Sequence, residues 1–262
     1  MTKSKFINKS LYQLERKTNL LSFIIFTLIV SIVMVVVIAL YPSMQDVLSK
    51  MPAELKDVVN FDTALEYFNT EAIELWVLLG CIYTTWLAVK LTSGDFRNKN
   101  SELLYSLNMS RGEILRTKLL RLVINATLFN VVLAIVSFFS LWIFCGKVAV
   151  GGILIFLLFA WLVTMIVGML MFGWGLMGKH VFSAFAGIVI VVMFFIIPGI
   201  AVSIQKVEWI GFLSPFTALY GDVVSNGFAG LLNRGASIII WTFVSAGTLA
   251  FGLINFKNVD LD

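Results

Sequence analysis

The sequence predicts an all-α membrane protein with six transmembrane helices, an N-terminal amphipathic helix on the membrane surface and both termini in the cytoplasm. Of its 262 residues, 60% are hydrophobic and 13% are charged, whereas soluble domains carry about 25% charged residues. Six long apolar stretches recur along the chain, and each is long enough to cross the ~30 Å hydrocarbon core of a bilayer as a helix. A single membrane domain, residues 1–262, accounts for the whole chain.

Residues 1–18 form the predicted interfacial helix. Ile7, Leu11 and Leu14 fall on one face of a helix, and basic residues surround them. This pattern is typical of an amphipathic helix on an anionic cytoplasmic leaflet, although a merely basic tail that fixes topology would carry the same charges. The basic residues expected to touch membrane lipid are Lys5, Lys9, Arg16 and Lys17.

The six predicted membrane spans follow in order. The first is expected to be retained, because it is too long for a signal-peptide core and has no convincing small-residue cleavage site near Ala39. With the N-terminus inside, fourteen Lys and Arg residues fall on the inner side and five on the outer side. Since positively charged loops stay cytoplasmic, this bias places both termini inside. The spans are expected at residues 19–41, 72–92, 122–145, 150–177, 181–204 and 235–256.

Two outer segments differ in character. Residues 42–71 are acidic with apolar residues among them, which predicts one or two helical turns packed on the outer face. Residues 205–233 contain many aromatic and aliphatic side chains, among them Phe216 next to Pro215. We expect this second segment to be an outer re-entrant segment that dips into the membrane edge.

The fourth and fifth spans carry packing signals. Ala160, Thr164 and Gly168 are four residues apart, and small residues on one stripe let two membrane helices approach closely. Pro198 lies within the fifth span, where it should bend or interrupt the helix. Both signals concern packing and indicate little about function.

Residues 93–121 are predicted to be a cytoplasmic loop followed by a helical stalk. Within this stretch, residues 101–107 place Leu103, Leu104 and Leu107 at helical spacing, which predicts a short helix with one apolar face. An exposed apolar helix of this kind suits contact with a soluble partner.

The stalk begins at a predicted capping box formed by Ser110 and Glu113. A helix from Ser110 to Cys145 would rise about 50 Å, well beyond the ~30 Å hydrocarbon core. Roughly its first dozen residues should therefore stand in water. Seven basic residues mark the loop and stalk: Lys90, Arg97, Lys99, Arg111, Arg116, Lys118 and Arg121.

Several kinds of chemistry lack support in the sequence. The chain has one histidine, His180, and two cysteines, too few ligands for a zinc site, and no hydrolase elbow or phosphate-binding loop. The carboxylates Glu71 and Glu74 lie at the outer mouth of the second span, with none at mid-depth, which argues against a proton-coupled carrier. The basic residues lie at apolar boundaries, where topology explains them without a nucleic-acid partner. Active transport would therefore need energy from another polypeptide.

The run SELLYSLNMSRGEILRTKLL resembles the loop of type-2 ATP-binding-cassette (ABC) permeases, in which an acidic residue, a leucine-rich LLSLP-SR segment and a lysine precede the third span. The sequence departs from that pattern at Asn108, where proline is usual, and at Asn100 and Ser101, where Gly-Thr is common. The segment LSPF at 213–216 with Gly227, and the terminal FKNVDL, agree more weakly. The matching residues are Glu102, Leu103, Leu104, Ser106, Leu107, Ser110, Arg111 and Lys118.

The resemblance implies a non-catalytic permease subunit of an ABC exporter in a bacterial plasma membrane. It would pair with a second permease chain, identical or different, and dock on a cytoplasmic ABC ATPase that holds ATP and Mg, with no cofactor on this chain. The interfacial helix would be the family's connecting helix, and a hydrophobic or amphipathic cargo such as an antimicrobial or toxic peptide is expected. The residues that would couple to the ATPase are Glu102, Leu103, Leu104, Leu107, Arg111 and Glu113.

Two other functions remain open from the sequence. An ion- or proton-driven secondary carrier would work without a partner ATPase. A non-transporting membrane anchor or sensor would use the same loop only to hold an ATPase.

Overall fold

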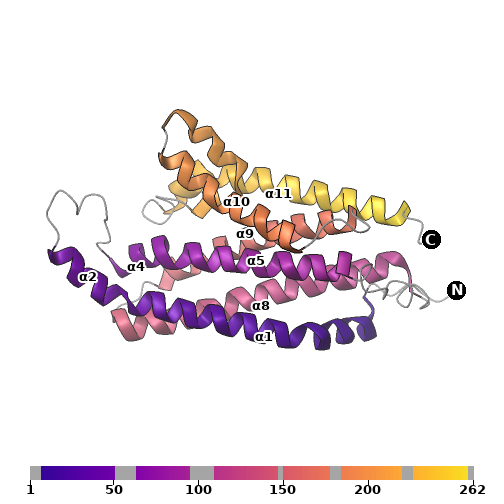
Figure 1. Ribbon diagram of the computed structural model, residues 1–262, viewed down its shortest axis with the longest axis horizontal. Coiled ribbons are helices and arrows are strands. Elements are labelled where there is room, and N and C mark those ends of the chain that lie inside the picture. Colours follow the sequence, from indigo (N-terminus) through magenta and orange to yellow (C-terminus); the bar gives the residue numbers. More distant parts are fainter. Residues whose placement is uncertain are drawn as a thin grey trace.

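The computed structural model describes residues 7–50, 63–94, 109–146, 150–177, 184–203, 205–219 and 227–258. All regular elements within these ranges are helical, and six helices are long and apolar enough to cross a membrane. The predicted all-α class and number of spans are therefore confirmed. Figure 1 shows the long helices lying lengthwise beside one another, with the start of α1 and the end of α11 at the same end of the molecule.

Each of the six long helices overlaps one of the predicted spans. Short helices precede the second span and follow the fifth, so the acidic segment 42–71 holds more helix than the one or two turns expected. In chain order the elements are α1 (Lys9–Ala39), α2 (Tyr41–Lys50), α4 (Ala64–Tyr67), the π-helical turn η1 (Phe68–Ala72), α5 (Ile73–Leu91), α8 (Arg111–Cys145), α9 (Val150–Met177), α10 (Ala184–Ser203), the 3₁₀ helices η2 (Gln205–Leu213) and η3 (Pro215–Leu219), and α11 (Gly227–Asn258).

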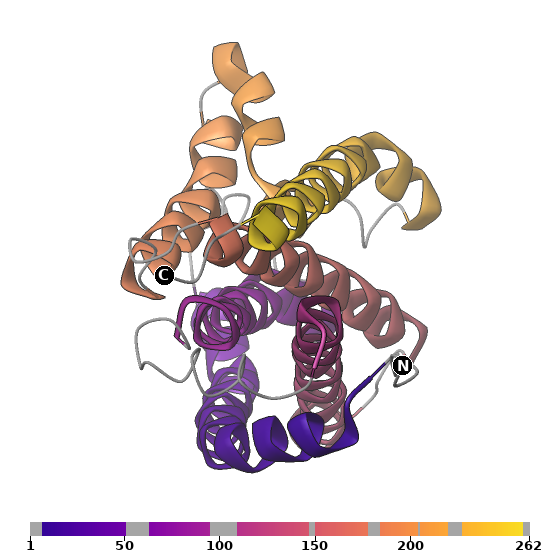
Figure 2. The same cartoon turned by 90° about the vertical axis from the view of Figure 1, so that its right-hand side faces the viewer.

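Helix α1 joins the predicted interfacial segment and the first span into one continuous helix. Asn8 caps it, because its side chain accepts hydrogen bonds from the backbone N–H groups of Ser10 and Leu11. No glycine or proline interrupts the sequence between Lys9 and Ala39, so nothing in the chain favours a break there. In Figure 2 the first turns of α1 run across the end of the bundle before the helix follows the other spans.

The six spans form two groups of three. Helices α1, α5 and α8 lie on one side of the molecule and α9, α10 and α11 on the other, with α5 packed on α9 between them (Figure 1). The apolar windows of α5 and α9 are 67% and 61% buried, whereas those of α1, α10 and α11 are each 22% buried. The outer helices therefore present large apolar side chains outward, as a membrane protein does.

Small residues set the closest helix contacts. A Cβ added to Gly80 of α5 would lie 2.8 Å from Thr164 Cγ2 of α9, and one added to Gly168 would lie 3.3 Å from Thr84 Cβ. At the next contact, a Cβ on Gly173 of α9 would lie 2.7 Å from the backbone of Thr248 in α11. The close approach predicted from the small-residue stripe is confirmed.

Helix α10 continues through Pro198 to Ser203. The interruption that the sequence allowed at this proline does not occur, because a membrane helix can lose one backbone hydrogen bond and continue when its neighbours compensate. The segment Gln205–Leu219 then packs against α10 and α11.

Candidate functional site

The candidate site lies where the chain leaves α5 and where it re-enters the bundle at α8. The predicted coupling residues Glu102, Leu103, Leu104 and Leu107, like Lys5 near the N-terminus, lie outside the described residues. The structure does describe the two anchoring ends of that segment, including Arg111 and Glu113.

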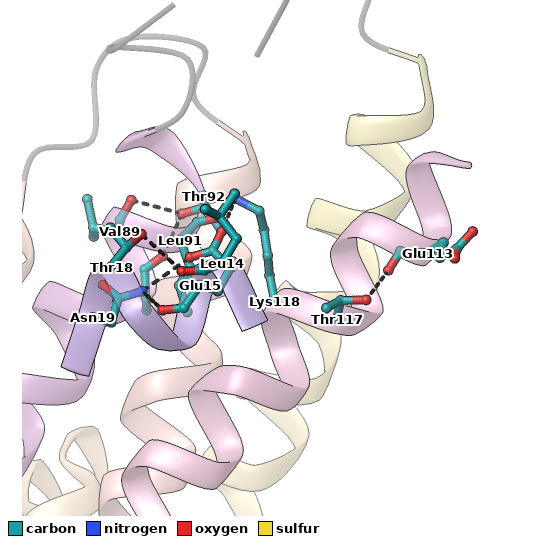
Figure 3. Close-up of polar contacts among 11 residues, drawn as sticks. Leu14, Glu15, Thr18, Asn19, Val89, Leu91, Thr92, Glu113, Thr117 and Lys118 are labelled. Atoms are coloured by element: carbon teal, nitrogen blue, oxygen red, sulfur yellow. Dashed lines mark hydrogen bonds and ion pairs between the residues drawn. The ribbon is translucent and has the colours of Figure 1, made fainter. Parts of the chain in front are cut away.

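The exit from α5 is held by a buried lysine. Lys118 Nζ donates to the backbone carbonyl of Leu91 at 2.9 Å and pairs with Glu15 Oε1 at 3.3 Å (Figure 3). Leu91 is the last residue of α5, so its carbonyl lacks an intrahelical partner, and a lysine near a helix C-terminus satisfies such a group. One ammonium group thus joins α8, α5 and α1, and we call Glu15, Leu91 and Lys118 the Lys118 clamp.

The next two residues of the exit bind α9. Ser93 Oγ donates to the carbonyl of Gly175 at 3.2 Å, and Thr92 Oγ1 donates back to the carbonyl of Ala88 at 2.8 Å. A Cβ on Gly175 would collide with Thr92 Oγ1 and lie 3.1 Å from Thr92 Cβ, so an alanine there would force Thr92 to shift. The exit is therefore fixed to α9 as well as to α8 and α1.

The re-entry at α8 begins with the predicted cap. Ser110 Oγ accepts from the backbone N–H of Glu113 at 3.2 Å, and α8 runs from Arg111 to Cys145, as predicted. The Glu113 carboxylate accepts from Asn8 Nδ2 at 3.4 Å, and the Asn8 backbone N–H donates to Thr117 Oγ1 at 3.1 Å. These bonds join the starts of α1 and α8.

The start of α8 also meets the end of α11. Arg111 Nη1 donates to the carbonyl of Phe256 at 3.5 Å. The two described residues of the predicted coupling set therefore contact two different helices: Glu113 contacts α1 and Arg111 contacts α11. Together, the bonds at the two ends of segment 95–108 reach α1, α5, α8, α9 and α11.

The first turns of α8, which the sequence predicts to stand in water as a basic stalk, pack against other helices of the chain. Lys118 is 2% exposed and Arg121 is 4% exposed, and the Arg121 guanidinium lies 5.8 Å from the centre of the Tyr12 ring. The apolar positions Ile114 and Leu115 on this helix, which were available in the sequence, signal a packed face. The basic residues of the stalk predicted a solvated face and did not indicate the packed one. A role in the site for Glu15, Thr92 or Ser93 was also not predicted from the sequence.

The predicted lipid-facing basic residues of α1 lie at the surface. Lys9, Arg16 and Lys17 are exposed, and so is Leu14, while Leu11 is buried against the protein. Part of the apolar face expected to meet lipid therefore contacts the protein.

The segment Gln205–Leu219 is held by a serine. Ser214 Oγ donates to the carbonyl of Phe194 in α10 and accepts from the backbone N–H of Phe216, while Ser237 Oγ of α11 donates to the Ser214 carbonyl at 2.8 Å. We call these four residues the Ser214 hub. Pro215 and Phe216, the predicted re-entrant residues, are both buried here.

A hollow of about 380 Å³ opens between α1, α5 and α10. Its walls are almost wholly apolar, and Lys90 Nζ lies 4.8 Å from the centre of the Trp86 ring at one wall. A volume of this size is within the range of small-molecule sites, roughly 300–1,000 Å³. Its lining residues are Ser22, Ile25, Phe26, Ile82, Tyr83, Trp86 and Ile188.

A chain of polar side chains crosses the middle of the bundle. Trp76 Nε1 donates to Asn130 Oδ1 at 3.1 Å, and Asn130 Nδ2 donates to Thr164 Oγ1 at 3.0 Å, which ties α5, α8 and α9 together. Across the described ranges, no three His, Cys, Asp or Glu side chains are placed to hold a metal ion. The polar groups of this chain hold the three helices to one another.

These features define a multi-pass membrane protein whose most elaborate polar site anchors one segment between helices. Residues 14–261 match the ABC-2 family transporter proteins, and since the match spans nearly the whole chain, the protein belongs to that family. The resemblance seen in the sequence is confirmed, and the chain is a membrane permease component. A search of curated proteins finds no match.

Proposed function

We propose that this chain is the permease subunit of an ABC exporter, driven by a separate cytoplasmic ATPase that binds ATP and Mg. The segment containing Leu103, Leu104 and Leu107 would seat on that ATPase with its apolar face. Family membership supports the class. The observation that carries the coupling role is that the two ends of segment 95–108 are bonded to five of the six long helices.

The anchoring suggests how force would reach the spans. A displacement of the segment would pull on α5 through Leu91 and Ser93 and push on α8 through its capped first turn. Because both helices are long and apolar, they would carry that displacement along their length as rigid bodies. Two such chains, identical or different, would rock against each other and open a path between them.

The hollow between α1, α5 and α10 supports a hydrophobic or amphipathic cargo. Its walls offer Phe26, Ile82 and Trp86, which suit an apolar side chain or acyl group. Lys90 and the exposed start of α1 place positive charge near the same surface. An antimicrobial or toxic peptide leaving a bacterial plasma membrane combines these properties.

The test is Leu104→Asp in the complete complex. A charge on the apolar face should lower ATPase co-purification and ATP-dependent efflux of a dansyl-labelled amphipathic peptide at least tenfold, while the chain still inserts in the membrane. The matched control is Val47→Asp on α2, an exposed residue at the opposite end of the molecule, which should behave as the unsubstituted chain does.

Two results would contradict the proposal. Normal efflux and normal ATPase binding by Leu104→Asp would exclude this segment as the contact. Robust flux through liposomes that hold only this chain and an ion gradient would favour a secondary carrier.

A further inference from the structure

The Lys118 clamp places an ion pair among packed helices. Lys118 is 2% exposed and Glu15 is 13% exposed on their side chains, so both charges have lost most of their water. Removing an ion pair from water costs free energy that its attraction often fails to recover, and apolar replacements of similar size are frequently neutral or stabilising. Fold stability alone therefore does not explain why a lysine stands at this position.

The geometry of the clamp is specific in a way that an apolar contact is not. The ammonium group reaches the carbonyl of Leu91, the last residue of α5, and the carboxylate of Glu15 in α1. Lys118 itself lies two turns into α8, just beyond the point where segment 95–108 re-enters the bundle. The clamp thus spans both ends of that segment and the first helix.

Other polar contacts near the clamp reach fewer helices. Asn8 joins α1 to α8 through Glu113 and Thr117 but makes no bond to α5 in the described structure. Ser93 joins the exit of α5 to α9. Lys118 is the group through which a movement of the α5 end would be passed directly to α1 and α8 together.

We propose that Lys118 is a positioning residue that makes α1, α5 and α8 move as one unit when segment 95–108 is displaced. This inference rests on the proposed function and deepens it. The ammonium is required for transmission because it holds three helix ends in one register, and the fold does not depend on it. A neutral side chain of similar length leaves the bundle packed but lets the end of α5 slip past α1.

The experiment uses the chain with its ATPase in nanodiscs, in a background with Cys81→Ala and Cys145→Ala. An environment-sensitive dye on Leu14→Cys, on the exposed side of α1, reports movement of that helix. In the unsubstituted complex, ATP with vanadate changes the dye fluorescence. We expect the paired variant, Lys118→Met with Glu15→Gln, which leaves no unpaired buried charge, to retain bound ATPase, thermal stability and ATP hydrolysis within about twofold. It should lose more than about four-fifths of the fluorescence change.

Companion variants separate a positioning role from a structural one. Lys118→Arg keeps a donor and a positive charge and should recover at least half of the signal. Lys118→Met alone leaves the largely buried Glu15 carboxylate unpaired and should lose thermal stability as well as signal. The matched control is Lys50→Met, an exposed lysine on α2 at the other end of the molecule. It should leave every measurement unchanged.

A second measurement needs no ATPase. Spin labels on α1 and α5, at Leu14→Cys and Lys90→Cys, should give a narrow distance distribution that broadens in the paired variant and stays narrow in Lys118→Arg. An unchanged distribution or a full dye signal in the paired variant overturns the inference. So does a loss of ATPase binding or thermal stability in that variant that parallels the lost signal, since the lysine is then merely structural.

If the unsubstituted chain binds no ATPase at all, the proposed function fails, and the spin-label distances still decide whether Lys118 holds these helices in register.

Discussion

The two ends of the molecule are held together by different chemistry. The Lys118 clamp, at the end where α1 begins, uses a buried charge pair and joins the first three spans. The Ser214 hub uses neutral hydroxyl and backbone groups and joins α10 to α11. Charge-assisted bonds are strong and depend on alignment, whereas neutral hydrogen bonds each add only about 1 kcal/mol. We infer from this difference that the clamp transmits movement between helices, whereas the hub holds the turn between η2 and η3 in place.

The largest loss of stability is expected from Gly173→Ala, which tests how much the close packing of α9 on α11 contributes beside the clamp and the hub. The added Cβ would lie 2.7 Å from the backbone of Thr248 in α11, and backbone atoms cannot rotate away as a side chain can. We expect the free energy of unfolding in mixed micelles, measured by SDS titration, to fall by about 3 kcal/mol.

The control for that variant is Gly247→Ala on α11, where an added Cβ meets nothing within 4 Å. Alanine favours a helix over glycine by about 1 kcal/mol, so this variant should be neutral or slightly more stable. Equal losses in the two variants would mean that close contact between α9 and α11 is not the cause.

The second largest effect is expected from Ser214→Ala in the hub. The change removes the donor to the Phe194 carbonyl, in a part-buried bond, and the acceptor for the Phe216 N–H, in a buried one. Leaving these two backbone groups without partners should lower the free energy of unfolding by about 2 kcal/mol. Because no charge is involved, the loss should be the same at low and high salt.

Ser43→Ala on the exposed surface of α2 is the matched control and should change the stability little. A loss in Ser214→Ala that shrinks as salt rises would show that the hub is coupled to charged groups, and the contrast between the two ends would then be wrong.

The sequence predicted the spans because their signal is local. Each long helix needs only an uninterrupted apolar run, and the start of α8 could be placed at Ser110 because a cap and the helix after it adjoin in the chain. The small-residue stripe on α9 was readable for the same reason, since helical spacing puts Ala160, Thr164 and Gly168 on one face.

The clamp could not be predicted, because its three members come from distant parts of the chain. Lys118 was visible as a basic stalk residue, but the sequence does not show that Glu15 and the Leu91 carbonyl lie beside it. The partner of a helix-end carbonyl is decided by how α1 packs across α8, and that packing depends on tertiary contacts. The same holds for Ser93 and Gly175, which meet only because α5 lies on α9.

The smallest loss of stability is expected from Ser110→Ala, which tests whether the cap of α8 acts together with the Lys118 clamp. Losing the cap leaves the Glu113 N–H without its acceptor and should cost about 1 kcal/mol in the free energy of unfolding. Ser137→Ala is the control on the same helix, because the Ser137 hydroxyl is buried without a hydrogen-bond partner in the described structure, so its removal should be neutral.

If Ser110→Ala lowers the α1 dye signal far more than it lowers stability, the first turn of α8 acts with the clamp in transmission. If the signal and the stability fall in proportion, the cap only holds the helix.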